Sequence, residues 1–353
     1  MNPRERITAA LNHREPDRTP VFEYVLQPPV ADAVLEREYL YGERLAGFVK
    51  EHGWEKSISQ MATDMVEIAV RLKHDMIYAV PNPAPGDFAK RDSGIKKAPC
   101  FSDPVEDIGH RLKQSEEKPY TPQEERFFIY RCLKESMKDS GVDLPILAPA
   151  YAHGVWTDVS LMQAMLLAPE LVSRWYERRT EDTIRLIDIY NSLGIEMFGV
   201  GGDFAGTKGP LISPDAYRKF IMPEIRKLSR HIHSLGKTAV NASDGNLWPV
   251  IEDFLLGCEV DGYIEIDYFA GMDLYELKKR YGNRITFFGN LDCGNILSFG
   301  SIEEIKIHVR QTLEKGWGNG GHILCASNAI TESISPENYF AVYDEYRKFF
   351  NLQ

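Results

Sequence analysis

The sequence predicts a (β/α)8 barrel that forms a single domain over residues 1–353. Eight short apolar runs end beside Gly, Asp, Asn or Pro, and long helical patterns separate them. Such alternation gives a parallel sheet, and eight repeats in 353 residues favour a closed barrel over an open doubly wound sheet. No Gly-x-Gly-x-x-Gly motif follows the first run, which removes the main support for a dinucleotide-binding fold.

The strands and the helices between them have recognisable boundaries. A hydroxyl before a proline predicts helix starts at Thr121-Pro122 and Ser213-Pro214. Ser301 and Glu304 form a capping box, and Gly316 ends that helix. The predicted strands are Thr19–Glu23, Asp75–Val80, Leu144–Pro149, Ile195–Val200, Thr238–Asn241, Gly262–Ile266, Ile285–Gly289 and His322–Cys325.

One segment fits this alternation poorly. Residues 81–120 are too long for an ordinary connection and too polar for a core. We interpret them as an inserted excursion after the second strand, a small hairpin and helix that forms a lid over the barrel mouth. The alternative is a solvated decoration without a covering role.

Composition excludes several classes of function. A net charge of -11 opposes binding to a phosphate backbone, so nucleic acid is not an expected partner. No apolar run approaches the roughly 20 residues that cross a bilayer, and the first residues do not resemble a signal peptide, so we expect no membrane association and a cytoplasmic location. The five scattered cysteines, with no Cys-x-x-Cys pair, indicate free thiols.

Candidate site residues follow from the barrel itself, because active sites of such barrels lie at the carboxyl ends of the strands. The polar residues at these ends are Glu23, Tyr151, His153, Asp203, Asn241, Asp244, Glu265, Asp267, Asn290, Asp292, Cys325 and Asn328. His153 is a candidate acid or base because imidazole titrates near neutrality, and the alternative is a histidine that packs in the core. Rings just beyond strand ends, Tyr24, Tyr151 and Trp156 among them, predict an aromatic mouth.

Several motifs resemble the uroporphyrinogen decarboxylase superfamily. They lie along nearly the whole chain: Pro3–Arg6, Asn12–Arg18, Gly201–Asp203, Ile212–Pro214, Asn241–Asn246, Gly271–Asp273, Phe288–Asp292 and Ser335–Asn338. Porphyrinogen decarboxylases carry an arginine-rich loop after the first strand, which holds substrate carboxylates. Residues 22–29 here contain one acid, Glu23, and no arginine, so a polycarboxylate would be repelled. The resemblance therefore does not imply uroporphyrinogen decarboxylation.

The other branch of this superfamily moves methyl groups to or from a corrinoid on a separate small protein. Its zinc-dependent members use a His-x-Cys pair and a distant Cys, and the resemblance maps these ligands to Ala242, Asp244 and Asn328. Alanine supplies no ligand, so the usual zinc set is absent. If a metal binds at all, its candidate ligands are Asp244, Glu265 and Cys325, and the alternatives are a turn-forming acid at Asp244 and a core thiol at Cys325.

Together these observations predict a corrinoid-dependent methyltransferase of one-carbon metabolism, most simply an O-demethylase. It would pass a methyl group from a methoxylated substrate, an aromatic one being the first candidate, or from another methylated small substrate to a corrinoid protein. The alternatives are a decarboxylase or lyase of a small acid and a ligand-binding member with reduced catalysis. A homodimer is an expected but untested assembly. Candidate catalytic residues are Asp203, Asp244, His153 and Asn241, and candidate substrate-binding residues are Glu23, Tyr24, Tyr151, Trp156, Glu265, Asp267 and Asn328.

Overall fold

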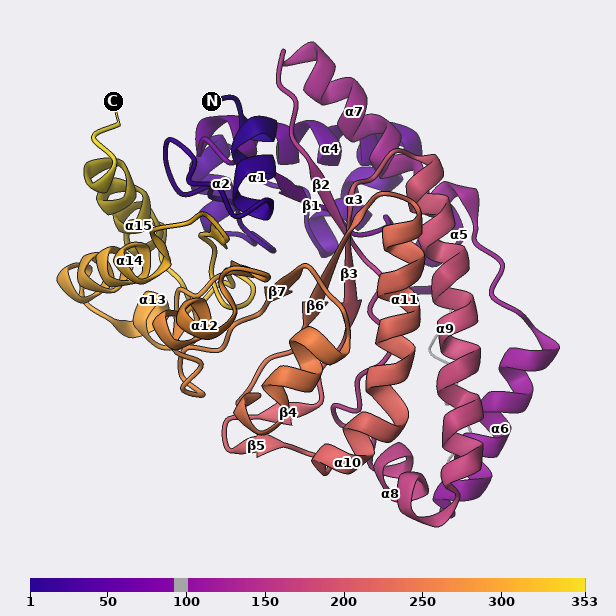
Figure 1. Ribbon diagram of the computed structural model, residues 1–353. Coiled ribbons are helices and arrows are strands. Elements are labelled where there is room, and N and C mark those ends of the chain that lie inside the picture. Colours follow the sequence, from indigo (N-terminus) through magenta and orange to yellow (C-terminus); the bar gives the residue numbers. More distant parts are fainter. Residues whose placement is uncertain (92–100, 353) are drawn as a thin grey trace. The chain divides into compact units, whose positions relative to one another are not determined.

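A computed structural model describes residues 1–91 and 101–352 (Figure 1). Residues 92–100 of the predicted excursion, with Cys100 among them, lie outside the described residues. The chain divides into two compact units. Unit 1 comprises Met1–Pro85, Glu124–Leu147 and Ile264–Gln353, and unit 2 comprises Gly86–Gln123 and Ala148–Tyr263.

Unit 1 contains five parallel strand segments. Asp75 N donates to Val21 O, the residues of β1 pair in parallel with β2, and β8 pairs in parallel with β9. The chain at Val21 also forms a parallel bridge with Leu324, just after β9. Its elements are α1 (Pro3–Leu11), α2 (Val30–Leu35), α3 (Glu43–His52), α4 (Trp54–Arg71), β1 (Ile77–Tyr78), η1 (Glu124–Phe127), α7 (Phe128–Asp139), β2 (Ile146–Pro149, which crosses the unit boundary), α12 (Leu274–Tyr281), β8 (Thr286–Phe288), α13 (Ile296–Phe299), α14 (Ile302–Gly316), β9 (His322–Ile323) and α15 (Pro336–Phe349).

Unit 2 is built around two long parallel strands, β3 and β6, which pair from Met197 with Thr238 to Gly201 with Ala242. Two long helices, α9 and α11, run side by side in Figure 1 and contact each other. Its elements are α5 (Pro85–Arg91), α6 (Pro104–Glu117), α8 (Val159–Leu167), α9 (Pro169–Ser192), β3 (Met197–Gly201), β4 (Ala205–Gly206), β5 (Gly209–Pro210), α10 (Pro214–Ala216), η2 (Tyr217–Ile221), α11 (Met222–Ser234), β6 (Thr238–Ala242), η3 (Trp248–Val250), η4 (Asp253–Gly257) and β7 (Gly262–Ile264, which crosses the boundary).

Most predicted helix boundaries are confirmed. Ser301 forms the capping box with Glu304, and α14 ends at Gly316. The Ser213 hydroxyl accepts from Ala216 N at the start of α10. The helix start predicted at Thr121-Pro122 is wrong, because the Thr121 hydroxyl donates to Pro119 O and α7 begins only at Phe128, after a 3-10 turn.

The excursion after the second strand contains two helices, α5 and α6, among its described residues. Helix α6 packs against α8 and α9, and Arg111 joins it to Asp158 with a 2.6 Å ion pair. The neighbours of α6 within unit 2 are therefore helices. A covering role over the barrel mouth stays a prediction.

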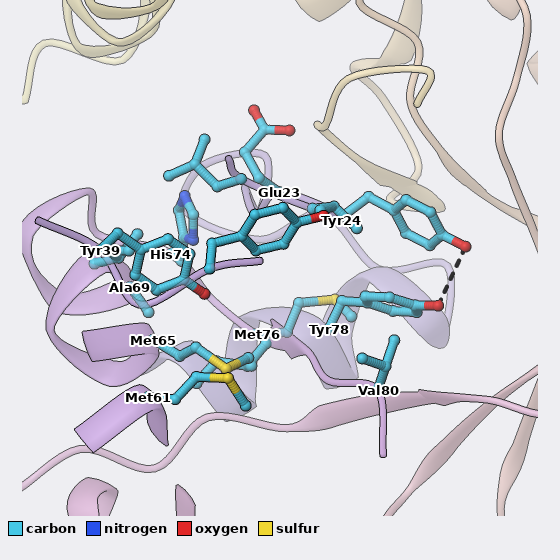
Figure 2. Close-up of a pocket in the computed structure, with 15 residues that line it drawn as sticks. Glu23, Tyr24, Tyr39, Met61, Met65, Ala69, His74, Met76, Tyr78 and Val80 are labelled. Atoms are coloured by element: carbon cyan, nitrogen blue, oxygen red, sulfur yellow. Dashed lines mark hydrogen bonds between the residues drawn. The ribbon is translucent and has the colours of Figure 1, made fainter. Parts of the chain in front are cut away.

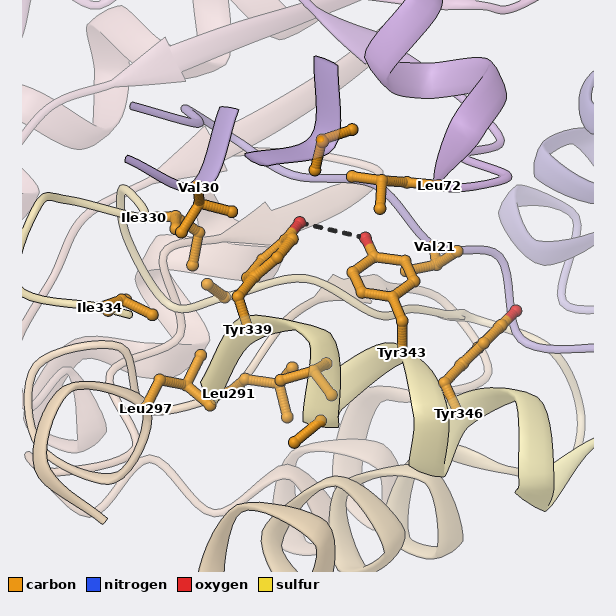
Figure 3. Close-up of a cluster of buried hydrophobic side chains, with 14 of the residues drawn as sticks. Val21, Val30, Leu72, Leu291, Leu297, Ile330, Ile334, Tyr339, Tyr343 and Tyr346 are labelled. Carbon is orange, nitrogen blue, oxygen red and sulfur yellow. Dashed lines mark hydrogen bonds between the residues drawn. The ribbon is translucent and has the colours of Figure 1, made fainter. Parts of the chain in front are cut away.

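A large apolar core in unit 1 lies beneath α15 (Figure 3). Val21, Leu324 and Ala326 contribute from the strand segments, while Tyr339 and Tyr343 contribute from α15, and all five are at most 5% exposed. The two tyrosines are four residues apart, so both lie on the same face of the helix. Figure 3 shows their rings projecting from α15 with the hydroxyl groups turned toward each other.

A buried carboxylate, Asp75, ties the start of the second strand to the first. Its Oδ1 accepts from Arg6 Nη1 at 2.5 Å, and its Oδ2 accepts from Arg18 Nη1 at 2.7 Å and from Val21 N at 2.9 Å. The Asp75 side chain is 0% exposed. Such a charge is tolerated in a core only when it is paired and fully hydrogen-bonded, as it is here.

Asp75→Asn is expected to destabilise the protein strongly, because it removes the anion paired with the buried Arg18 guanidinium and one of the two anions paired with Arg6. Breaking one partner of a buried pair costs about 3–5 kcal/mol. Urea denaturation measures this loss. Asp143→Asn is the control, because the Asp143 side chain is 68% exposed and its pair with Arg4 contributes at most about 1 kcal/mol. Equal effects of the two substitutions would contradict the role given to Asp75.

Candidate active site

A cavity of about 150 Å³ in unit 1 lies beyond the first strand segment and beside β1 and α4 (Figure 2). Its wall is mainly aromatic and aliphatic, with one carboxyl group, that of Glu23, and one imidazole, that of His74. In Figure 2 the Glu23 carboxyl group lies on the opposite side of the cavity from Met61 and Met65. The other lining residues are Tyr24, Val25, Leu26, Tyr39, Tyr41, Met61, Met65, Ile68, Ala69, Met76, Ile77, Tyr78 and Val80.

Helix α4 forms one wall of the cavity because of its residue spacing. Met61, Met65, Ile68 and Ala69 lie at positions i, i+4, i+7 and i+8, which places them on one face of the helix. Methionine is unbranched and polarisable, so the two methionines adapt to the edge or face of a ring. This wall therefore suits a flat apolar ligand.

Two pairs of neighbouring tyrosines also line the cavity. The rings of Tyr24 and Tyr78 have centroids 4.1 Å apart, and Tyr78 Oη donates to Tyr24 Oη at 3.2 Å. The rings of Tyr39 and Tyr41 stack at 6.3 Å, and Tyr41 Oη accepts from Gln27 Nε2. Tyrosine hydroxyls supply hydrogen bonds without adding charge.

Glu23 is the acid of this cavity. Its side chain is buried, and burial raises the pKa of Glu23 from 4.5 to about 8. Two hydrogen bonds to the carboxylate, from Ala326 N at 3.2 Å and from Tyr339, oppose part of that rise in pKa. Glu23 is therefore a neutral acid near pH 7, held ready to donate a proton.

His74 is the imidazole on the cavity wall. Burial, with a smaller effect of the nearby Arg18 charge, lowers the pKa of His74 to about 3. Its Nε2 lies 2.7 Å from Tyr343 Oη. His74 is therefore a neutral imidazole near pH 7.

The wall carries no charge at neutral pH, because Glu23 keeps its proton, His74 is neutral, and the lining residues include no Lys or Arg. The predicted repulsion of a polycarboxylate by Glu23 is therefore wrong in its cause. The lining residues include no cation that could pair with a carboxylate.

In unit 2, Asp203 and Asp244 lie together at the carboxyl ends of β3 and β6. Asp203 Oδ1 accepts from Asp244 N at 3.2 Å, and both side chains are partly exposed. Backbone packing beneath them is close, since a Cβ on Gly154 would stand 2.7 Å from Asp203 O. The structure thus brings two of the predicted catalytic residues together, and their catalytic role stays a prediction.

His153 and Asn241 have structural partners in unit 2. His153 is 0% exposed, its Nε2 lies 2.9 Å from Thr180 Oγ1, and burial lowers its pKa to about 3. The Asn241 amide donates to Phe254 O and accepts from Ala242 N, and this side chain is 1% exposed. These contacts are those of a histidine packed in the core, the alternative given for His153, and a catalytic role of either residue stays a prediction.

The predicted aromatic mouth in unit 2 involves Tyr151 and Trp156. The Tyr151 ring lies so close to Gly199 that a Cβ there would stand 2.5 Å from its hydroxyl. Trp156 is 54% exposed. A role of either residue in binding substrate stays a prediction.

Four predicted residues lie in unit 1 near the ends of strands. Asp267 Oδ1 accepts from Ala270 N, and Asn328 Oδ1 accepts from Ala329 N, so both side chains stabilise turns. Glu265 is buried, with a backbone φ of 69°. Cys325 is fully buried, and burial raises the pKa of its thiol.

Two of the three mapped zinc positions lack the usual ligand, whereas Asp244 keeps a carboxylate that could bind a metal. Ala242 is buried and has no ligand atom, and the Asn328 oxygen already accepts a backbone hydrogen bond. The usual set of one His and two Cys ligands is therefore absent at the three mapped positions.

Sequence reasoning missed His74, Tyr339 and Tyr343. His74 directly precedes the second predicted strand, and the tyrosines lie four residues apart on the last helix, where aromatic residues usually indicate core packing. The signal that could have found them is a histidine beside a strand together with hydroxyl-bearing rings at helical spacing.

A sequence model of the family described as "Uroporphyrinogen decarboxylase (URO-D)" matches residues 146–349. The chain belongs to this family. A URO-D family chain is also what the motifs at Gly201–Asp203 and Phe288–Asp292 predicted.

Two curated relatives represent both branches of the superfamily. The chain is 30% identical over 122 residues to uroporphyrinogen decarboxylase of Trichodesmium erythraeum (strain IMS101), covering 35% of this chain and 31% of the relative. It is 24% identical over 197 residues to methylcobamide:CoM methyltransferase MtaA of Methanosarcina barkeri, covering 53% of this chain and 55% of the relative. The chain thus spans about a third to about half of the length of these relatives.

A solved methyltransferase from Methanosarcina mazei shares the fold. It is 17% identical, covers 99% of both chains and gives a TM-score of 0.71. This match confirms the α/β barrel predicted from the eight repeats. Among the described residues, no helix is both long and apolar enough to cross a membrane.

Because the pKa of Glu23 is raised in the folded chain, the free energy of unfolding should depend on pH. The folded chain keeps this proton up to a pH of about 8, whereas the unfolded chain loses it near 4.5. Stability from Glu23 is therefore fully present below pH 4.5 and is lost as pH rises to about 8, by up to about 1.4 kcal/mol per pH unit. Glu23→Gln has no such proton to lose, so its stability relative to wild type should increase across this window.

Urea denaturation at several pH values measures this difference in unfolding free energy. The difference should stay constant below pH 4.5, increase between pH 4.5 and 8, and stay constant again above that range. A difference in unfolding free energy that is independent of pH, or that changes only below pH 4.5, would show that Glu23 is not protonated in the folded chain near pH 7.

Proposed function

We propose that this protein is a methyltransferase that moves a methyl group from a methoxylated aromatic compound to a corrinoid carried on a separate protein. The family contains both methyltransferases and decarboxylases, so membership alone does not choose between them. The observation that carries the proposal is the uncharged, tyrosine- and methionine-lined cavity with one protonated acid.

Size and chemistry both favour a single neutral ring as ligand. An engineered apolar cavity of about 150 Å³ binds benzene, and the cavity here has about the same volume. Paired tyrosines and the methionines of α4 offer aromatic rings and polarisable sulfur. A methoxybenzene or a methoxyphenol satisfies these contacts without burying a charge.

Glu23 supplies the proton that the reaction needs. When the bond between the ether oxygen and the methyl carbon breaks, the oxygen keeps the electron pair and leaves as a phenolate unless it is protonated. A phenol has a pKa of about 10, so proton transfer from Glu23, with a pKa of about 8, is favourable by roughly 2.7 kcal/mol. A reduced corrinoid, brought by its own protein, supplies the acceptor for the methyl group.

Incubation with cob(I)alamin and a panel of methoxybenzenes, methoxyphenols, methylamines and carboxylic acids tests this function. We expect methylcobalamin and the corresponding phenol from the methoxylated aromatics, detected by absorbance and chromatography. Carbon dioxide release from a carboxylic acid would support the decarboxylase alternative. Tight binding of an aromatic without turnover would support the binding-member alternative.

Glu23→Gln should lower kcat/KM for the methoxylated aromatic by about 10²–10⁴-fold, because the amide has no acidic proton to donate. Binding of the phenol product should change far less, because the amide is neutral and has nearly the same shape. Glu51→Gln is the matched control, since the Glu51 side chain is 75% exposed. An unchanged rate for Glu23→Gln contradicts the acid role.

Ala69→Leu should weaken substrate binding by extending a side chain from α4 into the cavity. Overfilling a packed site costs about 1–3 kcal/mol, so KM should rise about tenfold. Ala69→Ser changes the same position with little added volume and serves as the control. Equal KM values for Ala69→Leu and wild type would place the substrate elsewhere.

A further inference from the structure

The Glu23 carboxyl group and the His74 imidazole on the cavity wall are also linked by hydrogen bonds through two buried tyrosines of α15. Tyr339 hydrogen-bonds to Glu23, and its Oη lies 3.3 Å from Tyr343 Oη, within hydrogen-bonding reach. Tyr343 Oη lies 2.7 Å from His74 Nε2. Neither tyrosine lines the cavity, so the connection passes through the core of unit 1.

We propose that Glu23, Tyr339, Tyr343 and His74 form a proton relay that returns a proton to the acid of the cavity after each turnover. Tyr339 and Tyr343 are at most 5% exposed, so water has little access to their hydroxyl groups. Their spacing on α15 and the facing hydroxyls in Figure 3 give a continuous path of hydrogen bonds. This inference rests on the proposed function, which makes Glu23 lose a proton in each turnover.

The relay is balanced in protons and needs no other reactant. After Glu23 has given its proton to the leaving oxygen, Tyr339 donates its hydroxyl proton to the carboxylate. In the same concerted transfer Tyr343 donates its proton to Tyr339, His74 donates its Nε2 proton to Tyr343, and water protonates His74 at Nδ1, so no tyrosinate or imidazolate forms. The net change is one proton moved from solvent to Glu23, and exchange of the imidazole proton with water returns His74 to the Nε2–H tautomer before the next turnover.

The groups around the relay keep its members neutral. Arg18 lies near His74, and its positive charge disfavours a second proton on the imidazole. That charge is itself paired with Asp75, and Arg18 Nη1 also donates to Tyr346 Oη at 2.5 Å. Cys325, near Glu23, stays a thiol because burial raises its pKa. His74 therefore passes protons on rather than storing them.

A pH jump on the ligand-free protein tests the relay apart from methyl transfer. The protein is equilibrated at pH 9.5, where Glu23 is ionised, and mixed rapidly to pH 7, and the return of the protonated carboxyl band is followed by infrared spectroscopy. Glu23→Gln identifies the band by removing it. Tyr343→Phe and His74→Gln should slow its return at least tenfold, since each interrupts the path at a different point.

Tyr346→Phe is the matched control for loss of a buried hydroxyl on the same helix. Tyr346 is 1% exposed and donates to Thr19 O, outside the path from Glu23 to His74. Its substitution should leave the rate of band recovery unchanged, and thermal melting verifies that each variant is folded.

Tyr339→Phe adds an equilibrium measurement. It removes a hydrogen bond that lowers the pKa of Glu23, so the midpoint of the carboxyl band should move to higher pH. Wild-type recovery rates in both Tyr343→Phe and His74→Gln overturn the relay. Absence of methylcobalamin in the enzyme assay would instead overturn the proposed function and leave this result standing.

Discussion

The buried carboxylate of Asp75 is the interaction on which both polar ends of the cavity depend. It accepts from Val21 N, two residues before Glu23 in the first strand segment, and it directly follows His74 in the chain. Arg6 and Arg18 compensate its charge, which joins helix α1 and the first strand segment to the second. One ion-pair cluster thus fixes the positions of Glu23 and His74 relative to each other.

Burial sets the protonation states of Glu23 and His74. The same apolar surroundings that raise the pKa of Glu23 lower the pKa of His74, and each residue is uncharged as a result. Tyr339 and Tyr343 connect them without introducing a charge. An uncharged acid beside apolar ring faces is suited to protonating a leaving phenolate, and it gives no support to the binding of a polycarboxylate.

Local patterns predicted the fold well, because strand and helix boundaries depend on neighbouring residues. The capping box at Ser301 and the cap at Ser213 need only three or four residues to form. At Thr121 the local pattern was not sufficient. The Thr121 hydroxyl donates to Pro119 O instead of capping a helix, and no helix begins there. The rule that active-site residues follow strand ends also identified Glu23. That rule does not distinguish a side chain that lines a cavity from one that packs in the core, and His153, which is 0% exposed, is of the second kind. The link from His74 to Tyr343 joins residues 269 positions apart, and no local pattern contains it.

The central claim is that Glu23 is a neutral acid on an aromatic cavity, and carbon-13 NMR tests it most directly. Glutamate labelled at the side-chain carboxyl carbon gives a resonance that shifts on ionisation, and Glu23→Gln assigns the resonance of Glu23. We expect a midpoint near pH 8 for Glu23, well above the unperturbed glutamate pKa of about 4.3. A Glu23 midpoint in that ordinary range would contradict the account, because the cavity would then carry a negative charge and have no proton to give.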